Sequence, residues 1–249
     1  MTTQKVAVVT GASSGIGAAT SLLLANNGYR VIATARRADR LAELARSSSN
    51  IETCVADLTA QPDVNALAAF CAGKPVEVLV NAAGGAFDAA AVLEGDPEVW
   101  AKTYDINVIA TLRVTKAITP LMRSHGRGHI VIISSTAGHR AYENGGSYVA
   151  AKFAETSLAH TLRLELNGEP IRITEIAPGM VKTDEFAVNR FAGDAAKAAK
   201  VYEGVDAPLT AEDVAESIRW SVMLPNHFNV DSMVIRPLAQ AANHKVYRA

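Results

Sequence analysis

A strand, a glycine-rich turn and a helix follow one another at the start of the chain, and this order limits the possible fold. Residues 5–10 form a short β-branched run typical of a buried strand. The run leads directly into Gly11-Ala12-Ser13-Ser14-Gly15-Ile16-Gly17, and a helix-periodic apolar stretch covers 18–27. Glycines permit a tight turn and let a phosphate approach the N–H groups at the start of a helix. The junction therefore favours a nucleotide site over a plain tight turn.

Strand-like and helix-like segments alternate along the rest of the chain. Apolar runs predict further strands at 30–35, 51–56, 76–80, 130–133, 171–176 and 232–236. Helical patterns lie between them, at 64–71, after Pro97, around 148–152 and at 211–224. Such alternation predicts parallel strands joined by helical crossovers. We therefore expect one domain over 1–249, an α/β, Rossmann-like, doubly wound parallel sheet of about seven strands with helices on both faces.

Charge and composition exclude several classes of protein. The chain has 24 basic and 25 acidic residues, so no electrostatic case exists for binding nucleic acid or an anionic membrane. Its two cysteines and six histidines show no metal-ligand spacing, and we expect no metal. No apolar run is long enough to span a bilayer, and no signal peptide is evident. We expect a cytoplasmic protein.

The ends of the predicted strands carry candidate cofactor residues. An NAD site uses a carboxylate after the second strand to bind the ribose, but this chain has Arg36 and Arg37. Two guanidinium groups suit a 2′-phosphate and favour NADP, although they could be solvated arginines at a helix start. Asp57 follows the third strand near the expected adenine position, or serves as an ordinary turn or N-cap residue. Asn81 can fix a turn or a ribose ahead of small residues 82–85.

Tyr148 and Lys152 lie four residues apart and so share one face of a predicted helix. A phenol is a weak acid and base at neutral pH, and a fixed cation nearby favours its ionised form. Taken alone, the pair could be an interfacial Tyr beside a solvated Lys. Asn107 falls inside the long helix that Pro97 opens, where Asn is a poor helix former. Its side chain could face solvent, mark a local kink, or interrupt the helix to hold a water.

Combined, these motifs resemble the short-chain dehydrogenase/reductase family. The resemblance rests on TGASSGIG at 10–17, NAAG at 81–84, Asn107, Ser135, Tyr148-x3-Lys152 and Pro178-Gly179, in matching order and spacing from 5 to about 178. Ala82 departs from the family, which usually has a second Asn there. Segments 184–194, 209–220 and 224–241 look like the NADP-dependent 3-hydroxy acid (serine and allo-threonine) dehydrogenase subgroup, although Lys182-Thr183-Asp184 is closer to the broader family's pattern.

The resemblance implies roles for the polar residues. Tyr148 is expected to act as general acid in carbonyl reduction and general base in alcohol oxidation, with Lys152 favouring its ionised form and holding the nicotinamide ribose. Ser135 is expected to donate to the substrate oxygen, because its gap of thirteen residues to Tyr148 fits the family better than that of Ser134. Asn107 would hold a water that links Lys152 to solvent.

The expected cofactor is NADP(H), and Thr183 would bond its carboxamide. The residues expected to bind the cofactor are Gly11, Ser13, Ser14, Gly15, Ile16, Gly17, Arg36, Arg37, Asp57, Leu58, Asn81, Ala82, Gly84, Tyr148, Lys152, Pro178, Gly179, Val181 and Thr183.

The stretch 180–208 looks irregular, and a long irregular segment inside a domain is usually functional. We expect it to be a lid over a small-molecule substrate. A hydroxy acid needs a cationic partner, for which Arg190, Lys182 and Arg140 are candidates, although each could be a solvated surface charge. Tyr142 and Phe186 are candidate pocket walls, or simply core side chains.

The sequence therefore predicts an oxidoreductase that transfers a hydride between NADP(H) and a small secondary alcohol. The expected substrate is a 3-hydroxy acid such as serine, allo-threonine or 3-hydroxyisobutyrate, and the alternative is a carbonyl reductase for a bulkier ketone or aldehyde. A protein that only senses NADP(H), or a structural subunit, would not need Asn107, Ser135, Tyr148 and Lys152 together. The family implies a homotetramer built on the helices of Asn107 and Tyr148.

Overall fold

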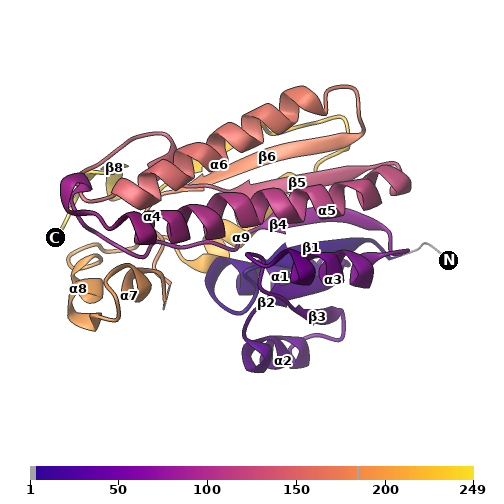
Figure 1. Ribbon diagram of the computed structural model, residues 1–249, viewed down its shortest axis with the longest axis horizontal. Helices are drawn as coiled ribbons and strands as arrows, with labels where there is room; N and C mark the ends of the chain where they lie inside the picture. Colours follow the sequence, from indigo (N-terminus) through magenta and orange to yellow (C-terminus); the bar gives the residue numbers. More distant parts are fainter. Residues whose placement is uncertain (1–3, 184) are drawn as a thin grey trace.

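A parallel β-sheet forms the centre of the computed structural model, which describes residues 4–183 and 185–249 (Figure 1). Within these residues the sheet has seven strands in the order β3-β2-β1-β4-β5-β6-β7, and every neighbouring pair is parallel. The predicted fold class is confirmed. The strands are β1 (Val6–Thr10), β2 (Arg30–Ala35), β3 (Ile51–Val55), β4 (Val76–Asn81), β5 (Gly128–Ile133), β6 (Ile171–Pro178) and β7 (Ser232–Ile235).

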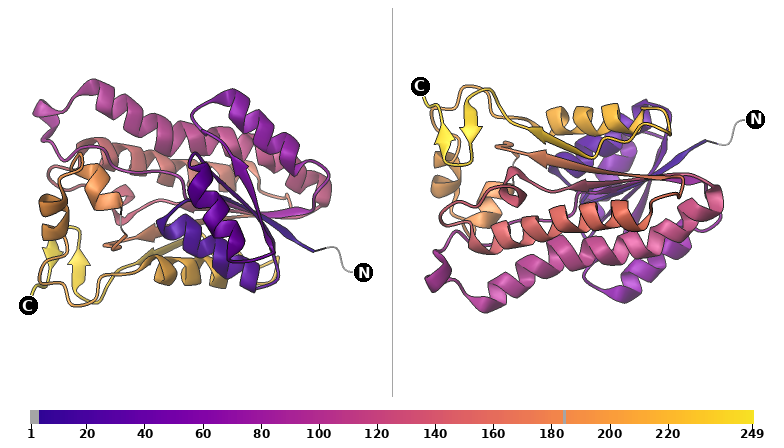
Figure 2. Two further views of the ribbon diagram at one scale, coloured as in Figure 1. Left: turned by 90° about the horizontal axis from the view of Figure 1, so that it is seen from below. Right: turned by 90° about the horizontal axis from the view of Figure 1, so that it is seen from above.

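Helices cover both faces of the sheet (Figure 2). One apolar core joins the sheet to α3, α5 and α6, and a second joins its other face to α1, α2 and α9. The four central strands β1, β4, β5 and β6 are fully buried, as strands covered on both faces must be. The helices are α1 (Gly15–Asn26), α2 (Ala38–Arg46), α3 (Gln61–Cys71), α4 (Pro97–Tyr104), α5 (Ala110–His125), α6 (Gly146–Glu165) and α9 (Ala211–Val222).

The strand order reverses between β1 and β4, and the carboxyl ends of these strands open the crevice where such sheets bind ligands. Here the turn after β1 meets the loop after β4. A Cβ on Gly11 would lie 2.8 Å from the Ala82 carbonyl oxygen, and one on Gly17 would lie 2.5 Å from the Gly11 carbonyl oxygen. Both glycines are therefore required by close backbone approach. Thr10 Oγ1 accepts hydrogen bonds from the backbone N–H groups of Ala82 and Ala83, which ties the two loops together.

The long helix predicted after Pro97 is interrupted. A π-helical turn, η2 (Asp105–Ile109), separates α4 from α5, and Asn107 lies inside it. Such turns leave backbone groups out of the regular helical ladder and are frequent at functional sites.

Two predictions were wrong. The stretch 180–208 is not irregular, because it contains α7 (Phe186–Arg190) and α8 (Ala195–Lys200). The end of the chain forms an antiparallel hairpin of β8 (Gln240–Ala242) and β9 (Lys245–Val246), although no strand was expected there. Elements of two to six residues are too short to show a period in the sequence.

Within residues 4–183 and 185–249, no helix combines the length and the apolar character needed to cross a bilayer. Asp184, the first residue of one segment that supports the family resemblance, lies outside the described residues.

Candidate active site

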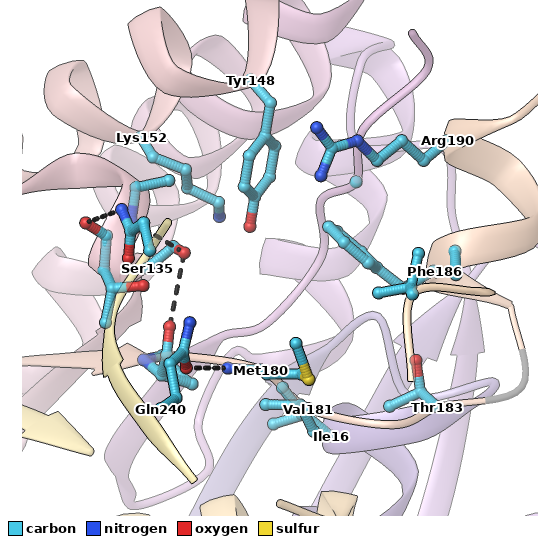
Figure 3. Close-up of a pocket in the computed structure, with 18 of the residues that line it drawn as sticks. Ile16, Ser135, Tyr148, Lys152, Met180, Val181, Thr183, Phe186, Arg190 and Gln240 are labelled. Atoms are coloured by element: carbon cyan, nitrogen blue, oxygen red, sulfur yellow. Dashed lines mark hydrogen bonds between the residues drawn. The ribbon is translucent and has the colours of Figure 1, made fainter. Parts of the chain in front are cut away.

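The Tyr148 and Lys152 side chains project from one face of α6 into a cavity of about 400 Å³ (Figure 3). Tyr148 is 8% exposed and Lys152 is 5% exposed, so neither is a solvated surface residue. Lys152 Nζ donates to the carbonyl oxygen of Ile133 at the end of β5 (3.0 Å) and lies 5.5 Å from the centroid of the Tyr148 ring. Both side chains are therefore held beside the carboxyl end of the sheet.

Ser135 lies across the cavity from Tyr148, in the segment that connects β5 to α6 (Figure 3). It caps η3 (Thr136–Gly138), because its Oγ accepts a hydrogen bond from the Ala137 N–H (3.1 Å). The same Oγ donates only a long hydrogen bond, of 3.3 Å, to the Pro178 carbonyl oxygen. The Ser135 hydroxyl proton can therefore turn to a substrate oxygen at small cost. Ser134, by contrast, donates its hydroxyl proton to the Glu175 carboxylate, so that proton is not available to a substrate oxygen.

Asn107 fixes the loop after β4 from within η2. Its side-chain amide donates to the carbonyl oxygens of Gly85 (2.9 Å) and Thr103 (2.7 Å) and accepts from the Gly85 N–H (3.1 Å). Asn107 is fully buried, so a solvent-facing side chain is excluded and the interrupted helix is confirmed. A Cβ on Gly84 would lie 2.5 Å from Asn107 Oδ1 and 3.7 Å from Lys152 Nζ. Asn107 and Lys152 thus flank Gly84.

A second cavity of about 400 Å³ adjoins the first and shares Ile16, Gly84 and Thr183 with it. The glycine turn and the ends of β2 and β3 line this cavity. The residues expected to bind the cofactor lie along one cavity or the other, except Asn81. Asn81 is 2% exposed and donates to Thr115 Oγ1, so its side chain fixes the end of β4 and does not face a ribose site.

Arg37 is already paired in this cavity. Its guanidinium contacts the Glu185 carboxylate at 2.6 Å and donates to Ser13 Oγ and Ser14 Oγ, both at 2.9 Å. Ser14 Oγ in turn donates to the other Glu185 oxygen (3.1 Å). The hydrogen bond from Arg37 holds the pKa of Glu185 below its ordinary value. A protein carboxylate therefore occupies an anion site made of Ser13, Ser14 and Arg37.

Arg36 and Asp57 border the same cavity. Arg36 is exposed at its rim, and its charge contributes to lowering the pKa of Asp57, after the larger effect of the hydrogen bond from Thr59. Asp57 Oδ1 accepts from both the N–H and the hydroxyl of Thr59, so this residue caps a turn and borders the cavity at the same time.

The sequence model described as "short chain dehydrogenase" matches residues 5–191. The chain belongs to this family. Among its relatives, an uncharacterized oxidoreductase of Mycobacterium tuberculosis is 49% identical over 97% of this chain and 94% of the relative. The NADP-dependent 3-hydroxy acid dehydrogenase of Salmonella typhi is 35% identical over 98% of this chain and all of its own length.

Solved structures of short-chain dehydrogenases have the same fold. The closed form of a serine dehydrogenase complexed with NADP+ superposes with a TM-score of 0.91 at 34% identity, covering 98% of this chain and 100% of that one. Actinorhodin polyketide ketoreductase with NADPH gives a TM-score of 0.83 at 27% identity, covering 93% and 95%. The predicted resemblance to the family and to its 3-hydroxy acid dehydrogenases is confirmed.

In this short-chain dehydrogenase, three predicted residues lie beside Tyr148, namely Phe186 and Arg190 from segment 180–208 and Tyr142 from the loop before α6. The Phe186 ring packs edge-on against the Tyr148 ring, with 5.4 Å between centroids. Arg190 lies over the Tyr142 ring (5.5 Å) and donates to the Asn144 carbonyl oxygen (2.9 Å). Lys182 and Arg140 are exposed and line neither cavity, so the structure does not support them as partners for a substrate carboxylate.

The C-terminal hairpin contributes residues that the sequence did not single out. Gln240 packs over Gly179, where a Cβ would collide with its side chain, and accepts a hydrogen bond from the Met180 N–H (2.8 Å). Asn243 donates to the carbonyl oxygens of Thr136 (3.1 Å) and Arg140 (2.8 Å). Both residues line the Tyr148 cavity, so the hairpin closes one side of it. Its contacts with Gly179 and Met180, which follow β6, bring it there, and no sequence pattern indicates those contacts.

Proposed function

We propose that this chain transfers a hydride between NADP(H) and a small primary or secondary alcohol or its carbonyl product, with a 3-hydroxy acid as its substrate. Arg190 carries the assignment of the substrate class. Its side chain extends from α7 toward Tyr148 (Figure 3), and its Nε is buried with no hydrogen-bond partner among the described residues. A buried donor that lacks an acceptor is costly, and a substrate carboxylate would satisfy it. The relatives named for 3-hydroxy acids and serine support this choice.

The residues of the second cavity fit a phosphorylated dinucleotide. Gly11 and Gly17 let the turn after β1 pack closely against neighbouring backbone, and the first turn of α1 would direct its N–H groups toward the pyrophosphate. Arg36 and Arg37 stand at the end of β2, where an NAD site would have a carboxylate. When bound, the nicotinamide ring supplies or accepts the hydride. Thr183 would bond the nicotinamide carboxamide, and Lys152 would bond the nicotinamide ribose.

Side chains of the protein transfer the proton. In ketone reduction, Tyr148 gives its phenolic proton to the substrate oxygen, and in alcohol oxidation it takes that proton back. The Lys152 ammonium favours the phenolate. Ser135 turns its hydroxyl from Pro178 to the substrate oxygen, where negative charge develops. Asn107 would hold a water beside Lys152 for exchange of the proton with solvent.

One observation favours a second candidate function, the reduction of a bulkier ketone or aldehyde. Ile16, Met180, Val181 and Phe186 give the cavity apolar walls. Its volume of about 400 Å³ and this apolar lining exceed what a three-carbon acid needs. A polyketide ketoreductase is also among the similar structures.

Initial rates of NADP+ reduction with L-serine, allo-threonine and 3-hydroxyisobutyrate, set beside NADPH oxidation by bulky ketones, separate the two candidates. Turnover of the acids is expected. Turnover of bulky ketones alone would select the second candidate.

Replacing Arg36 and Arg37 together with Ala is expected to raise the Kd of NADP+ by about 10–100-fold, because charge-assisted hydrogen bonds to the 2′-phosphate are lost. The Kd of NAD+ should change by less than about threefold, since it lacks that phosphate. Glu185→Gln is the matched control, because it removes the carboxylate that competes for Arg37. It is expected to tighten NADP+ modestly, by up to about fivefold, since the pair is partly exposed. Isothermal titration measures these dissociation constants, and an equal loss of affinity for NADP+ and NAD+ in the double Ala variant would contradict the assignment.

We also propose that the protein is a homotetramer, as the family implies. Exposed apolar side chains on the outer faces of α4 and α6 support an interface there, namely Tyr104, Phe153 and Leu164. Analytical ultracentrifugation tests this, and a monomer at micromolar concentration would contradict it.

A further inference from the structure

A fully buried carboxylate lies next to the proposed proton-transfer pair, and the proposed mechanism does not use it. Tyr148, Lys152, Glu155 and Ala159 fall on one face of α6, and all four are buried. An apolar residue is the usual occupant of such a stripe. Glu155 is 0% exposed, and glutamate is rarely buried to this extent unless it is paired.

The partner of Glu155 is the Lys152 ammonium. Glu155 Oε2 lies 2.6 Å from Lys152 Nζ. Neither carboxylate oxygen accepts a hydrogen bond of regular geometry from any described residue, so the interaction is a contact between charges. Lys152 Nζ also donates to the Ile133 carbonyl oxygen (3.0 Å). Glu155 and Ile133 together hold the ammonium in place beside the Tyr148 ring.

Each member of the pair changes the proton affinity of the other. Burial raises the pKa of Glu155 to about 7, although Lys152 opposes this shift. Burial disfavours the Lys152 ammonium and is the largest single effect on it, but the nearby negative charges, of which Glu155 contributes most, together outweigh burial and raise the pKa of Lys152. A negative charge increases the proton affinity of the groups around it.

The other charged groups near α6 are paired or directed elsewhere. Glu175 on β6 is buried, which opposes its charge, but hydrogen bonds from Ser134, Thr156 and Ser232 outweigh burial and lower the pKa of Glu175. His139 lies 3.1 Å and His160 3.8 Å from that carboxylate. On the neighbouring helices, Asp105 pairs with Arg113, Lys102 lies over the Phe87 ring, and Glu98 is exposed. Glu175 also raises the pKa of Lys152, but less than Glu155 does, and Glu155 is the carboxylate in contact with the ammonium.

We propose that Glu155 is a positioning residue, which holds the Lys152 ammonium and sets the pH range in which Tyr148 exchanges its proton. The inference rests on the proposed function, because that function assigns the proton transfer to Tyr148. Removing the Glu155 charge lowers the proton affinity of both Lys152 and Tyr148. The rising and the falling limb of the plot of kcat/KM against pH for alcohol oxidation should then both move to lower pH.

The test compares Glu155→Gln, a neutral side chain of equal size, with Glu155→Asp, which keeps the charge. In Glu155→Gln, the pH midpoint of kcat/KM for NADP+ reduction is expected about one unit lower than in the unmodified protein. The pH midpoint of Glu155→Asp should stay within about 0.3 pH units of the midpoint of the unmodified protein. If Glu155→Gln folds poorly, Glu155→Met serves as a second neutral variant and should show the same displacement.

A titration without cofactor provides an independent measurement. The ultraviolet phenolate absorbance of each protein, minus that of its Tyr148→Phe counterpart, isolates the ionisation of Tyr148. The same displacement of about one unit is expected. Unchanged midpoints in both neutral variants, with or without loss of rate, would overturn the inference, as would an equal displacement in Glu155→Asp. If the unmodified protein shows no nicotinamide-linked turnover, the proposed function fails, but this titration still decides the role of Glu155.

Discussion

Tyr148→Phe is expected to lower kcat for NADP-linked turnover by about 10²–10⁴-fold, the usual contribution of a positioned general acid or base. The substitution removes only the hydroxyl group. The ring keeps its edge-on contact with Phe186, so the fold and the cavity should be preserved. The affinity for NADPH, measured by fluorescence titration, should stay within about twofold, because the cofactor cavity depends chiefly on the glycine turn and the end of β2.

Tyr142→Phe is the matched control. Tyr142 lines the same cavity and contacts Arg190, but the Lys152 ammonium lies over the Tyr148 ring instead. Its hydroxyl should therefore be dispensable for proton transfer, and kcat should fall by less than about tenfold. Near-normal turnover in Tyr148→Phe, or equal losses in the two variants, would show that Tyr148 does not transfer the proton.

Arg190→Ala has the second large expected effect. Losing a charged hydrogen-bond donor to the substrate carboxylate should raise KM for 3-hydroxy acids about 10–100-fold. For a neutral secondary alcohol, kcat/KM should change by less than about threefold, since that substrate has no carboxylate for Arg190 to bind. Steady-state kinetics with both substrate classes gives the comparison.

Arg190→Lys separates charge from shape. Lysine keeps the positive charge but lacks the planar pair of donors that matches a carboxylate. The KM for 3-hydroxy acids in Arg190→Lys should therefore lie between that of the unmodified protein and that of Arg190→Ala. An equal loss of kcat/KM for acids and for neutral alcohols would mean that Arg190 does not recognise the substrate. Its role would then be to hold segment 180–208 in place through Asn144 and Tyr142.

Features that depend on neighbouring residues could be predicted from the sequence. Each buried strand is a short apolar run, and within the glycine turn Gly11 has a positive φ and Gly17 closely approaches the Gly11 carbonyl oxygen. The four-residue spacing of Tyr148 and Lys152 fixes their shared helix face, and Asn107 marks the place where the helix is interrupted. These features locate the part of the candidate site that contains Tyr148, Lys152 and Asn107.

Features that depend on distant residues could not be predicted. Arg37 meets Glu185 across 148 positions of the chain, and the C-terminal hairpin lines the cavity because Gln240 packs against Gly179 and Met180, about 60 positions earlier. Glu155 is an intermediate case. Its spacing places it on the face of Lys152, but only the packing of α6 shows that both groups are buried and paired.

The most direct test of the central claim compares 3-hydroxyisobutyrate with its amide, two substrates of the same shape that differ in charge. With NADP+ and the unmodified protein, the acid should be oxidised with a kcat/KM about 10–100-fold above that of the amide, because only the acid presents a carboxylate to Arg190. NADPH formation followed by absorbance provides the rates. Equal rates for acid and amide, or no NADPH from either one, would contradict the account.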